Sequence, residues 1–247
     1  MTLAMTAHIG LDLYNMKNMN ALNVHMDTGS LCMKSVSIMH NEFFVRKDYD
    51  WWYKVQPGDV CVDIGACVGM FTAHALDSGA AKVYAVEPNK ELMKSVINNC
   101  YDYVVDQPEQ RLIPVDAAIG SDPGHTNFVF YTDDFKTMSF KDFIARYNIE
   151  RIDYLKLDCE GGEYDVLSEE NLDWVRKNVK HIAVECHLRA SPDNPAQFLN
   201  FRDKFLKPYI NEGRVRYMDK SMENRIWNTD AIMNQRPGEF MIYILAS

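Results

Sequence analysis

Charged side chains alternate along one short apolar segment of the sequence. Lys156, Asp158 and Glu160 stand at every second position of DYLKLDCEGGE, so in a β-strand all three point to one face. Charges on a buried strand cost free energy unless they are paired or functional. We therefore expect Asp158 and Glu160 to take part in chemistry and Lys156 to neutralise them. Glu163, at the start of the next helix, is expected to be structural, because the helix dipole stabilises an acid there.

A second group of titratable side chains ends a later apolar segment. Glu185 and His187 are two positions apart in HIAVECHL and again share one face of the predicted strand. A histidine beside a carboxylate is a candidate general base, although most single histidines are structural. The predicted catalytic residues are therefore His187 as the base, Glu185 or Asp158 to orient it, and Glu160.

The same four side chains also offer ligands for a divalent cation. Mg²⁺ or Mn²⁺ held by Asp158, Glu160, Glu185 and His187 would lower the pKa of a hydroxyl group and so replace the base. We rank this alternative below proton removal without a metal, and no metal ligand is predicted.

The segment VCVDIGACVGMF, residues 60–71, leads an apolar strand into Asp63 and then into two glycines. Gly65 and Gly69 have the spacing G-x-x-x-G, which differs from the dinucleotide pattern G-x-G-x-x-G. A residue without a side chain at position 65 lets the backbone pass close to a ligand, and the following helix offers free N–H groups. The simpler interpretation is a tight turn between a strand and a helix, without a ligand.

Glu87 makes a ligand the better interpretation. It ends the next predicted strand, directly before Pro88. An acid at this position in a neighbouring parallel strand can accept hydrogen bonds from both hydroxyls of a ribose. Together with Asp63 and Gly65, Glu87 therefore predicts a ligand that contains adenosine.

Strands and helices alternate through most of the chain, and this order predicts an α/β fold with a parallel sheet and helices on both faces. In such sheets ligands bind outside the carboxyl ends of the strands, where the acids above stand. Asn89 and Ser139 are predicted to cap helices. The expected strands span residues 60–65, 82–88, 126–132, 181–188, 214–219 and 239–246. Two further segments each contain a strand and the turn or loop that follows it, residues 111–120 and 153–163. The expected helices span residues 70–79, 90–100, 140–148, 164–178 and 198–210.

The first 50 residues give mixed signals. We expect short helices there, and the alternation between Ser30 and Tyr53 predicts strands in a hairpin. The chain is therefore predicted to consist of an N-terminal extension, residues 1–50, packed on a main domain, residues 51–247.

The composition limits the classes of function. The chain has 247 residues, 47% of them hydrophobic, which is enough for one large domain or at most two small ones. A net charge of -9 disfavours a nucleic-acid partner. Six cysteines without a C-x-x-C pair indicate reduced thiols in a cytoplasmic protein. No apolar run approaches the ~20 residues that span a bilayer, so no membrane span is expected.

Several of these segments together resemble one protein family. VDIGACVGMFT, AVEP, DAAIGSDPG, DYLKLDCEGGEYDVL and IAVECH look like motifs of the S-adenosylmethionine-dependent methyltransferases of the FkbM type. The resemblance extends from Pro57 to His187, and LKLDCEGGEYDVL is its most specific part. It implies a Rossmann-like methyltransferase fold, with a mostly parallel seven-stranded sheet and a C-terminal antiparallel strand. It also implies S-adenosyl-L-methionine as cofactor and methyl transfer to a hydroxyl of a small molecule, sugar or glycan.

The resemblance further implies which residues hold the cofactor. The glycine turn would line its methionine part, Glu87 would hold the ribose, the exit of the third strand would meet the adenine, and Asp158 would approach the amino or sulfonium group. The implied cofactor-binding residues are Asp63, Gly65, Ala66, Cys67, Gly69, Glu87, Pro88, Asp116, Ala117 and Asp158. Family members usually carry asparagine at the position of Cys67, so a side-chain contact there is lost or passes to the backbone.

Two other classes of function stay open. A nicotinamide-dependent oxidoreductase would also hold a ribose with Glu87, although the G-x-x-x-G spacing and the acids around Asp158 argue against it. A catalytically inactive protein of the same fold would bind the cofactor without transferring its methyl group, and Cys67 is the feature that points to it. The sequence does not indicate an oligomeric state.

Overall fold

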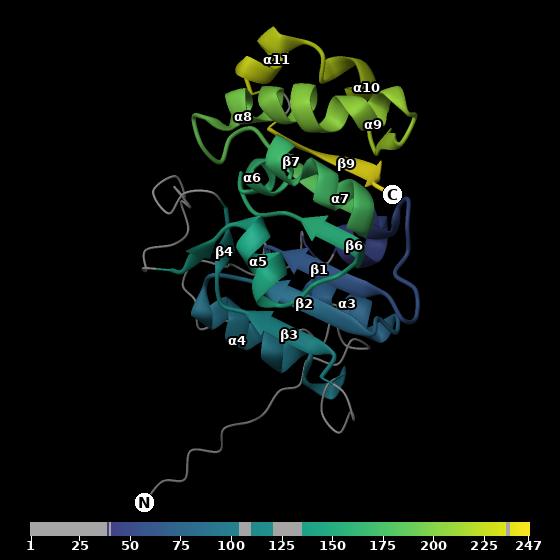
Figure 1. Cartoon of the computed structure of the whole chain (residues 1–247), viewed down its shortest axis with the longest axis vertical. Helices are drawn as coiled ribbons and strands as arrows, with labels where there is room; N and C mark the ends of the chain where they lie inside the picture. Colours follow the sequence, from purple (N-terminus) through teal and green to yellow (C-terminus); the bar gives the residue numbers. More distant parts are fainter. Residues whose placement is uncertain (1–38, 40, 104–109, 121–134, 236–237) are drawn as a thin grey trace, which may run out of the picture.

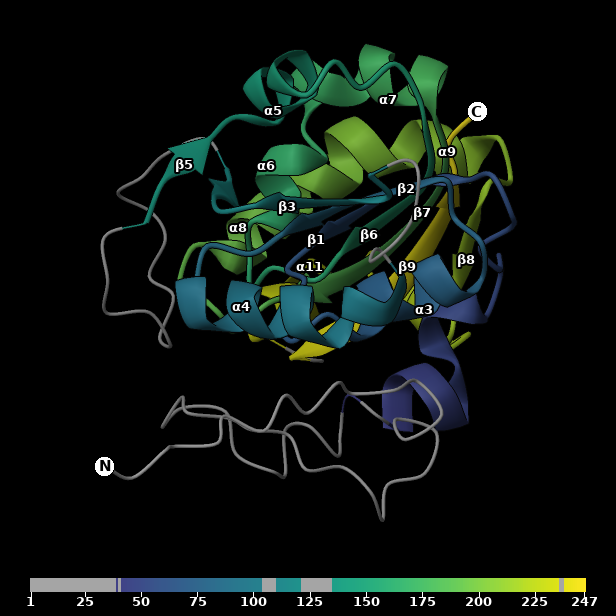
Figure 2. The ribbon, with the colours of Figure 1, turned by 90° about the horizontal axis from the view of Figure 1, so that it is seen from below.

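One sheet of seven strands organises the computed structural model, which describes residues 39, 41–103, 110–120, 135–235 and 238–247. The strand order is β3-β2-β1-β6-β7-β9-β8; Figure 1 shows it from β3 to β9, and Figure 2 shows β8 beside β9. β9 is antiparallel to both of its neighbours, whereas β1, β2, β3, β6 and β7 pair in parallel. The strands are β1 Val60–Ile64, β2 Lys82–Val86, β3 Leu112–Val115, β6 Ile152–Leu157, β7 Val179–His187, β8 Val215–Tyr217 and β9 Glu239–Leu245. The predicted fold class is confirmed.

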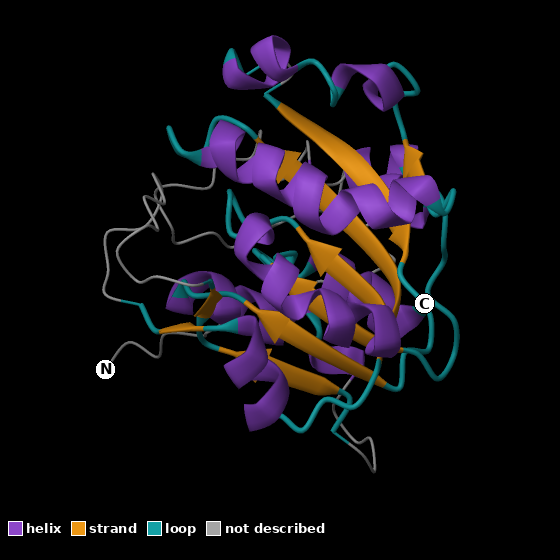
Figure 3. Ribbon diagram, turned by 45° about the horizontal axis from the view of Figure 1, so that its top comes forward, coloured by secondary structure: helices purple, strands orange, loops and turns teal. Residues whose placement is uncertain are grey.

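Helices cover both faces of this twisted sheet (Figures 2 and 3). α3 and α4 lie on one face, and α5 and α7 lie on the other (Figure 2). Each layer of helices encloses its own apolar cluster, which contains Phe71 and Val96 on the first face and Phe143 and Val175 on the second. The α-helices are α3 Met70–Asp77, α4 Lys90–Asn99, α5 Phe140–Arg146, α6 Glu163–Val166, α7 Leu172–Asn178, α8 Asn194–Asn200, α9 Lys207–Asn211, α10 Met222–Arg225 and α11 Thr229–Met233.

The central strands are apolar on both faces because both faces are covered. In β6, Leu155 and Leu157 belong to the cluster beneath α5 and α7, and Tyr154 belongs to the cluster beneath α3 and α4. Lys156 shares the face of Tyr154 and is buried. This buried cation in an apolar strand requires partners, which the site supplies.

The helix caps follow the sequence. The Asn89 side chain accepts hydrogen bonds from the backbone N–H groups of Glu91 and Leu92, at 2.9 and 3.1 Å, and so begins α4. The Ser139 hydroxyl accepts one from the N–H of Asp142 at 3.0 Å and begins α5. Both predicted caps are confirmed. A short 3₁₀ turn, η4 Tyr101–Tyr103, follows α4.

The prediction of one continuous helix over residues 164–178 is wrong. The segment consists of α6, a 3₁₀ turn and α7. The Asn171 side chain donates hydrogen bonds to the carbonyl oxygens of Asp165 and Val166, at 3.2 and 3.0 Å, and so satisfies the end of α6 before α7 begins. The helix predicted over residues 198–210 is present as α8, a π-helical segment and α9, while α10 and α11 were not predicted. The two intervening segments are η5 Glu169–Asn171 and η6 Phe201–Leu206.

The described end of the N-terminal extension is helical, so the predicted hairpin is corrected for residues 41–50. Local contacts favour these turns: Arg46 pairs with Glu42 across one turn at 3.5 Å, and the ring of Phe43 stacks on that of Tyr49 at 4.6 Å. The segments are the π-helix η2 Asn41–Arg46 and the 3₁₀ helix η3 Asp48–Asp50. The rest of the predicted hairpin up to residue 40, except Met39, and the strand predicted over residues 126–132 lie outside the described residues.

This helical end packs on the main sheet. The Tyr243 hydroxyl on β9 donates a hydrogen bond to the carbonyl oxygen of Asp48 at 2.6 Å, and the Tyr154 hydroxyl on β6 donates one to the carbonyl oxygen of Tyr49. The division into an extension and a main domain stays a prediction.

A separate two-stranded sheet pairs β4 Ala118–Ile119 with β5 Thr137–Met138.

Two further observations concern the described part of the chain. None of its helices is both long and apolar enough to cross a bilayer. The cysteines described there are free thiols, namely Cys61, Cys67, Cys100, Cys159 and Cys186.

Candidate active site

A cavity of about 300 Å³ lies at the carboxyl ends of β1, β2, β6 and β7. The chain builds β1, β2 and β3 in one direction and then crosses to β6 on the other side of β1. This reversal of strand order is where open α/β sheets bind ligands. The cavity is lined by Met39, Glu42, Ile64, Gly65, Cys67, Val86, Glu87, Pro88, Asn89, Leu92, Ala117, Ala118, Ile119, Asp158, Cys159, Glu160, Glu185, His187 and Glu239.

The carboxylate of Glu87 is fixed by two backbone N–H groups, one at each of its oxygens. Its Oε2 accepts a hydrogen bond from the N–H of Cys67 at 3.0 Å, and its Oε1 accepts one from the N–H of Asn89 at 2.9 Å. The side chain is buried and lies in the cavity wall next to the glycine turn. Its carboxylate is therefore held in one orientation before any ligand binds.

Gly65 is required by a contact within the protein. Its φ is +83°, and a Cβ at this position would lie 1.8 Å from the carbonyl oxygen of Asp158 at the end of β6. Gly69 also has a positive φ, and a Cβ there would press on Val96 of α4 at 3.0 Å. The two glycines thus let β1 meet β6 and let α3 meet α4, and Gly65 lines the cavity as well.

Asp63 and Lys156 form a buried pair behind the cavity. Lys156 Nζ lies 3.1 Å from the Asp63 carboxylate and 3.6 Å from that of Asp158, and it donates a hydrogen bond to the carbonyl oxygen of Gly65 at 2.6 Å. The Thr72 hydroxyl of α3 donates to the other Asp63 oxygen at 2.7 Å. Burial lowers the pKa of Lys156, but Asp63 and Asp158 outweigh it and the pKa is raised. Asp63 therefore anchors a permanent cation under the strand ends.

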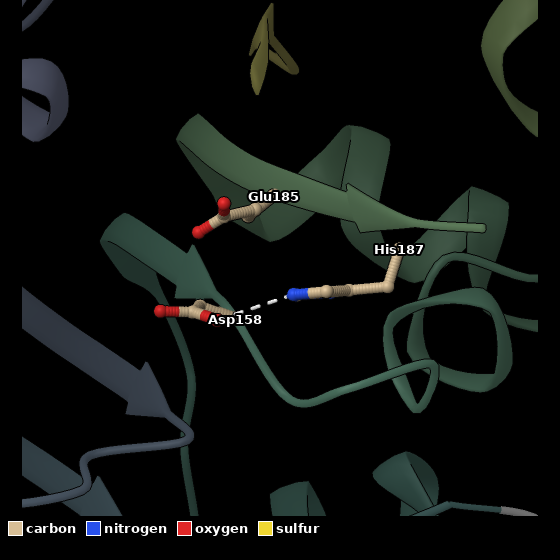
Figure 4. A group of neighbouring side chains, drawn as sticks. All are labelled: Asp158, Glu185 and His187. Atoms are coloured by element: carbon tan, nitrogen blue, oxygen red, sulfur yellow. Dashed lines mark ion pairs between the residues drawn. The ribbon is translucent and has the colours of Figure 1, made fainter. Parts of the chain in front are cut away.

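A cluster of two carboxylates and one imidazole faces the cavity from β6 and β7 (Figure 4). Asp158, Glu185 and His187 each offer one oxygen or nitrogen atom, and these atoms lie within 4.8 Å of one another. The Tyr49 hydroxyl reaches both carboxylates, at 3.1 Å from Asp158 and 3.3 Å from Glu185. We call Asp158, Glu185 and His187 the acid–histidine cluster. The predicted proximity of the two strand ends is therefore present.

Glu163, rather than Glu185 or Asp158, orients the histidine. Its Oε1 lies 3.2 Å from His187 Nδ1 and also accepts the backbone N–H of His187 at 2.8 Å. Its Oε2 accepts the N–H of Gly161 at 2.8 Å. Glu163 is buried, so the ring is held with Nε2 directed toward Asp158 (Figure 4).

Burial and crowding of acids shift the proton affinities of the site. Burial, with the charge of Asp158, raises the pKa of Glu185 to about 8 and that of Glu42 to about 7. Burial lowers the pKa of His187, but the hydrogen bond to Glu163 and the surrounding acids outweigh it and raise that pKa to about 10. The ring is therefore protonated at neutral pH and has to release this proton before Nε2 can accept another.

A second cavity, of about 350 Å³, adjoins the first. Glu42, Glu185 and Glu239 line both cavities. The other residues that line the second cavity are Arg46, Asp48, Tyr49, Met218, Asp219, Met222, Arg225, Phe240 and Met241. Of these three shared carboxylates, Glu185 belongs to the acid–histidine cluster, so the cluster lies at the boundary between the two cavities.

The first cavity brings together most of the residues that the sequence predicts for the site. Those that line it are Gly65, Cys67, Glu87, Pro88, Ala117, Asp158, Glu160, Glu185 and His187. Four others stand outside its lining, namely Asp63, Ala66, Gly69 and Asp116. Asp63 and Ala66 are buried, Gly69 packs against α4, and Asp116 is exposed.

Sequence reasoning missed four contributors. Tyr49, Glu42 and Glu239 come from segments far from the motifs, and no local pattern marks them. Glu163 does stand in the most specific motif, but its position at a helix start gave a sufficient structural reason for an acid. Its bond to His187 depends on how β7 packs beside α6.

Comparison with known proteins agrees with this architecture. The model of the methyltransferase FkbM domain matches residues 63–214, which is more than half of the chain. No curated protein sequence matches the chain.

Several solved structures resemble the chain at low sequence identity. Methyltransferase FkbM from Methylobacillus flagellatus KT is 15% identical with a TM-score of 0.50, over 82% of this chain and 47% of that one. The chain thus spans about half the length of that relative. The Methanococcus jannaschii fibrillarin pre-rRNA processing protein is 15% identical with a TM-score of 0.43, over 79% of this chain and 70% of that one. The O-methyltransferase from Bacillus cereus in complex with SAH is 13% identical with a TM-score of 0.42, over 75% and 72%.

The family match covers the glycine turn, Glu87, Asp158 and the acid–histidine cluster, and the sheet has the strand order described above. The chain therefore belongs to the FkbM family of S-adenosylmethionine-dependent methyltransferases.

Proposed function

We propose that the protein is an O-methyltransferase that acts on a hydroxyl group of a small molecule, a sugar or a glycan. The observation that carries this proposal is a single cavity with the oriented carboxylate of Glu87 in its wall and the acid–histidine cluster at β6 and β7. A net charge of -9 argues against a nucleic-acid acceptor. The free thiols suit a cytoplasmic location.

The lining of the first cavity fits the methyl donor. Glu87 supplies acceptors for the two ribose hydroxyls, apolar side chains such as Val86, Leu92 and Ile119 suit the adenine, and Asp158 suits the positive groups. When bound, S-adenosylmethionine supplies an electrophilic methyl group and departs as a neutral thioether. The backbone N–H of Cys67 orients Glu87, so the missing asparagine does not leave this carboxylate unsupported.

The acid–histidine cluster and Glu160 are suited to removing the proton of the acceptor. An alcohol is a poor nucleophile at neutral pH, and a positioned base accelerates such a reaction by about 10²–10⁴-fold. Tyr49 holds Asp158 and Glu185 together, and Glu163 directs His187 Nε2 toward them. Protons can therefore be shared among His187 and the neighbouring carboxylates. These residues also stand where a bound acceptor would meet the donor.

The second cavity is proposed as the place for the bulk of the acceptor. It meets the first at Glu42, Glu185 and Glu239, so a hydroxyl can reach the cluster from it. Methionine and aromatic side chains from the segments around β8 and β9 give it an apolar part, and methionine adapts to irregular shapes. An acceptor with both hydroxyl groups and an apolar portion fits this lining.

Donor binding tests the first half of the proposal. Calorimetry with S-adenosylhomocysteine should detect binding, and Glu87→Ala should weaken it at least tenfold, because hydrogen bonds to a charged acceptor contribute about 1.5–3 kcal/mol. Glu91→Ala is the matched control, since Glu91 is exposed on α4 and pairs with Lys94; it should leave the affinity unchanged. Binding of NAD in place of S-adenosylhomocysteine would contradict the proposal.

Methyl transfer tests the second half. Radiolabelled S-adenosylmethionine should transfer label to a hydroxyl in a panel of sugars, glycans and small alcohols. Donor binding without transfer to any member would favour the catalytically inactive alternative. Label on an amine alone would refute transfer to oxygen.

A further inference from the structure

The acid–histidine cluster has the composition of a metal site as well as that of a proton acceptor. Asp158 comes from the end of β6, and Glu185 and His187 come from β7 (Figure 4). The three residues converge from two neighbouring strands, with one possible ligand atom each inside 4.8 Å. Acids alone would not indicate a cation, so the orientation of the imidazole decides the argument.

His187 is oriented as a ligand would be, with Nε2 directed to a place where a cation can bind in exchange for the ring proton. Its side chain is 8% exposed, and its Nδ1 lies 3.2 Å from the fully buried carboxylate of Glu163. Nε2 makes no hydrogen bond to any described residue, and its nearest carboxylate oxygens, on Asp158 and Glu160, are 3.8 Å away. A buried ring nitrogen without a hydrogen bond is therefore aimed at two carboxylates.

This arrangement matches the outer shell of protein metal sites. A ligating histidine almost always donates its other N–H to a carboxylate or carbonyl, which fixes the tautomer and the direction of the ring. Glu163 is the carboxylate that contacts the other ring nitrogen, Nδ1, of His187. Its own oxygens also accept the backbone N–H groups of His187 and Gly161, so the carboxylate is fixed, and the ring cannot turn without losing its contact with Glu163 at Nδ1.

The separations suit a single ion. Two ligand atoms that each lie ~2.1 Å from an ion are at most ~4.2 Å apart. The 3.8 Å between His187 Nε2 and Asp158 Oδ1 satisfies this limit. The largest separation in the cluster, up to 4.8 Å, requires a carboxylate to move by less than ~1 Å. Lys156 and Tyr49 contact Asp158 at Oδ2, which leaves Oδ1 on the side of the histidine.

We propose that Asp158, Glu185 and His187 bind a divalent cation of the Mn²⁺ type, through Asp158 Oδ1, a carboxylate oxygen of Glu185 and His187 Nε2. Two carboxylates and one imidazole suit an ion that accepts both oxygen and nitrogen ligands. Three protein ligands leave positions open at the boundary of the two cavities. Resting on the proposed O-methyltransferase activity, the cation would bind the acceptor oxygen there and lower the pKa of its hydroxyl, whose proton then passes to water. In this state Glu185 acts as a ligand and not as a base.

Titration of Mn²⁺ into the 247-residue chain, followed by electron paramagnetic resonance of free Mn²⁺, tests the inference without any substrate. The wild type should remove one equivalent of ion per chain. Glu185→Gln and His187→Gln should each weaken binding at least tenfold. Glu163→Gln should weaken it about 10–100-fold through the loss of ring orientation. Glu239→Gln is the matched control: it makes the same substitution in the same cavity wall but outside the cluster, and should change affinity less than about threefold, as expected for a carboxylate that does not coordinate.

The outcomes separate this inference from the proposed function. If the wild type binds S-adenosylhomocysteine but leaves Mn²⁺ free at millimolar concentration, the metal site is refuted while the methyltransferase proposal stands. Equal weakening by Glu239→Gln and Glu185→Gln would also refute it, because the ion would then be held by the general negative charge. Mn²⁺ binding that depends on the cluster, without binding of S-adenosylhomocysteine, would uphold the metal site and refute the proposed function.

Discussion

At position 65 the absence of a side chain is a structural requirement. The end of β1 passes so close to the end of β6 that a Cβ would overlap the carbonyl oxygen of Asp158. The carbonyl oxygen of Gly65 in turn accepts a hydrogen bond from Lys156. The glycine therefore lets the glycine turn lie directly beside the end of β6, from which Asp158 of the acid–histidine cluster comes.

Gly65→Ala should lower the free energy of unfolding by about 2–4 kcal/mol, because both the positive φ and the overlap with the backbone act against the methyl group. Gly58→Ala is the matched control. Its φ of +89° is similar to the +83° of Gly65, but nothing lies within 4 Å of a Cβ there, so only the backbone cost of about 1–2 kcal/mol remains. Urea unfolding of both variants measures the difference. Equal losses would show that the close contact between β1 and β6 is unimportant.

Cys67 illustrates a second constraint at this scale. Its φ is +52°, in the left-handed region where asparagine is favoured over most other residues. The backbone, rather than the thiol, makes the bond to Glu87. Burial and the charge of Glu87 raise the pKa of the thiol to about 12, so it stays neutral beside the carboxylate.

Among the elements, the junction between β2 and α4 couples the site to a helix. Glu87, Pro88 and Asn89 follow one another, and the N–H of Asn89 binds Glu87 while its side chain caps α4. The helix start thus fixes the carboxylate that we assign to the ribose.

Asn89→Ala should destabilise the protein by about 0.5–2 kcal/mol, because two N–H groups at the start of α4 lose their acceptor. Asn89→Gly should cost only a few tenths of a kcal/mol, since glycine is tolerated at such a cap. Both variants keep the backbone N–H that binds Glu87. Thermal unfolding provides the comparison, and an alanine variant as stable as the wild type would contradict the role of the cap.

Across the whole molecule, the carboxyl ends of the parallel strands and the opposite ends carry different groups of charged residues. The carboxyl ends hold the cavities and their crowded acids, whereas the opposite ends hold a compact ion-pair network around Asp153. Its carboxylate accepts the N–H of Val60 at 2.9 Å and lies 2.5 Å from Lys180 and 3.3 Å from Arg151. This network ties β1, β6 and β7 together away from the site.

The Asp153 network predicts a dependence of stability on pH. Burial raises the pKa of Asp153, but the bonds from Lys180 and Val60 and the nearby cations outweigh it and lower the pKa. The unfolded chain therefore binds more protons below about pH 4, the ordinary range of this group, so the stabilisation is complete above that range and is lost as pH falls through the lower folded value.

Asp153→Asn should cost about 1.5–3 kcal/mol at pH 7, and its difference from the wild type should shrink as pH falls toward 3. Urea unfolding at several pH values measures this difference. Asp173→Asn, at an exposed position on α7, is the control and should show little effect at any pH. A difference for Asp153→Asn that stays constant with pH would contradict the assignment.

The sequence by itself determined the seven strands of the main sheet, most of the described helices and the family. Strand and helix periods are local, and the caps at Asn89 and Ser139 involve neighbours within three residues, so short stretches of sequence contain the necessary information. The alternation of Asp158 with Lys156, and of Glu185 with His187, also fixed which side chains share a face. The helix break at Asn171 and the helical turns of residues 41–50 were not predicted, because side-chain bonds to backbone carbonyls and ring stacking override the apolar pattern.

Only the tertiary structure decided which side chains from other segments contact those faces. Tyr49 is separated from Asp158 by 109 residues, and no local pattern relates the two. Asp63 stands at a strand end that suggests a ligand, yet packing of α3 turns it into the partner of Thr72 and Lys156. The second cavity and its shared wall of carboxylates arise where η2, η3 and β9 come together. Periodicity fixes the direction of a side chain, but the partner that it finds depends on contacts between distant segments.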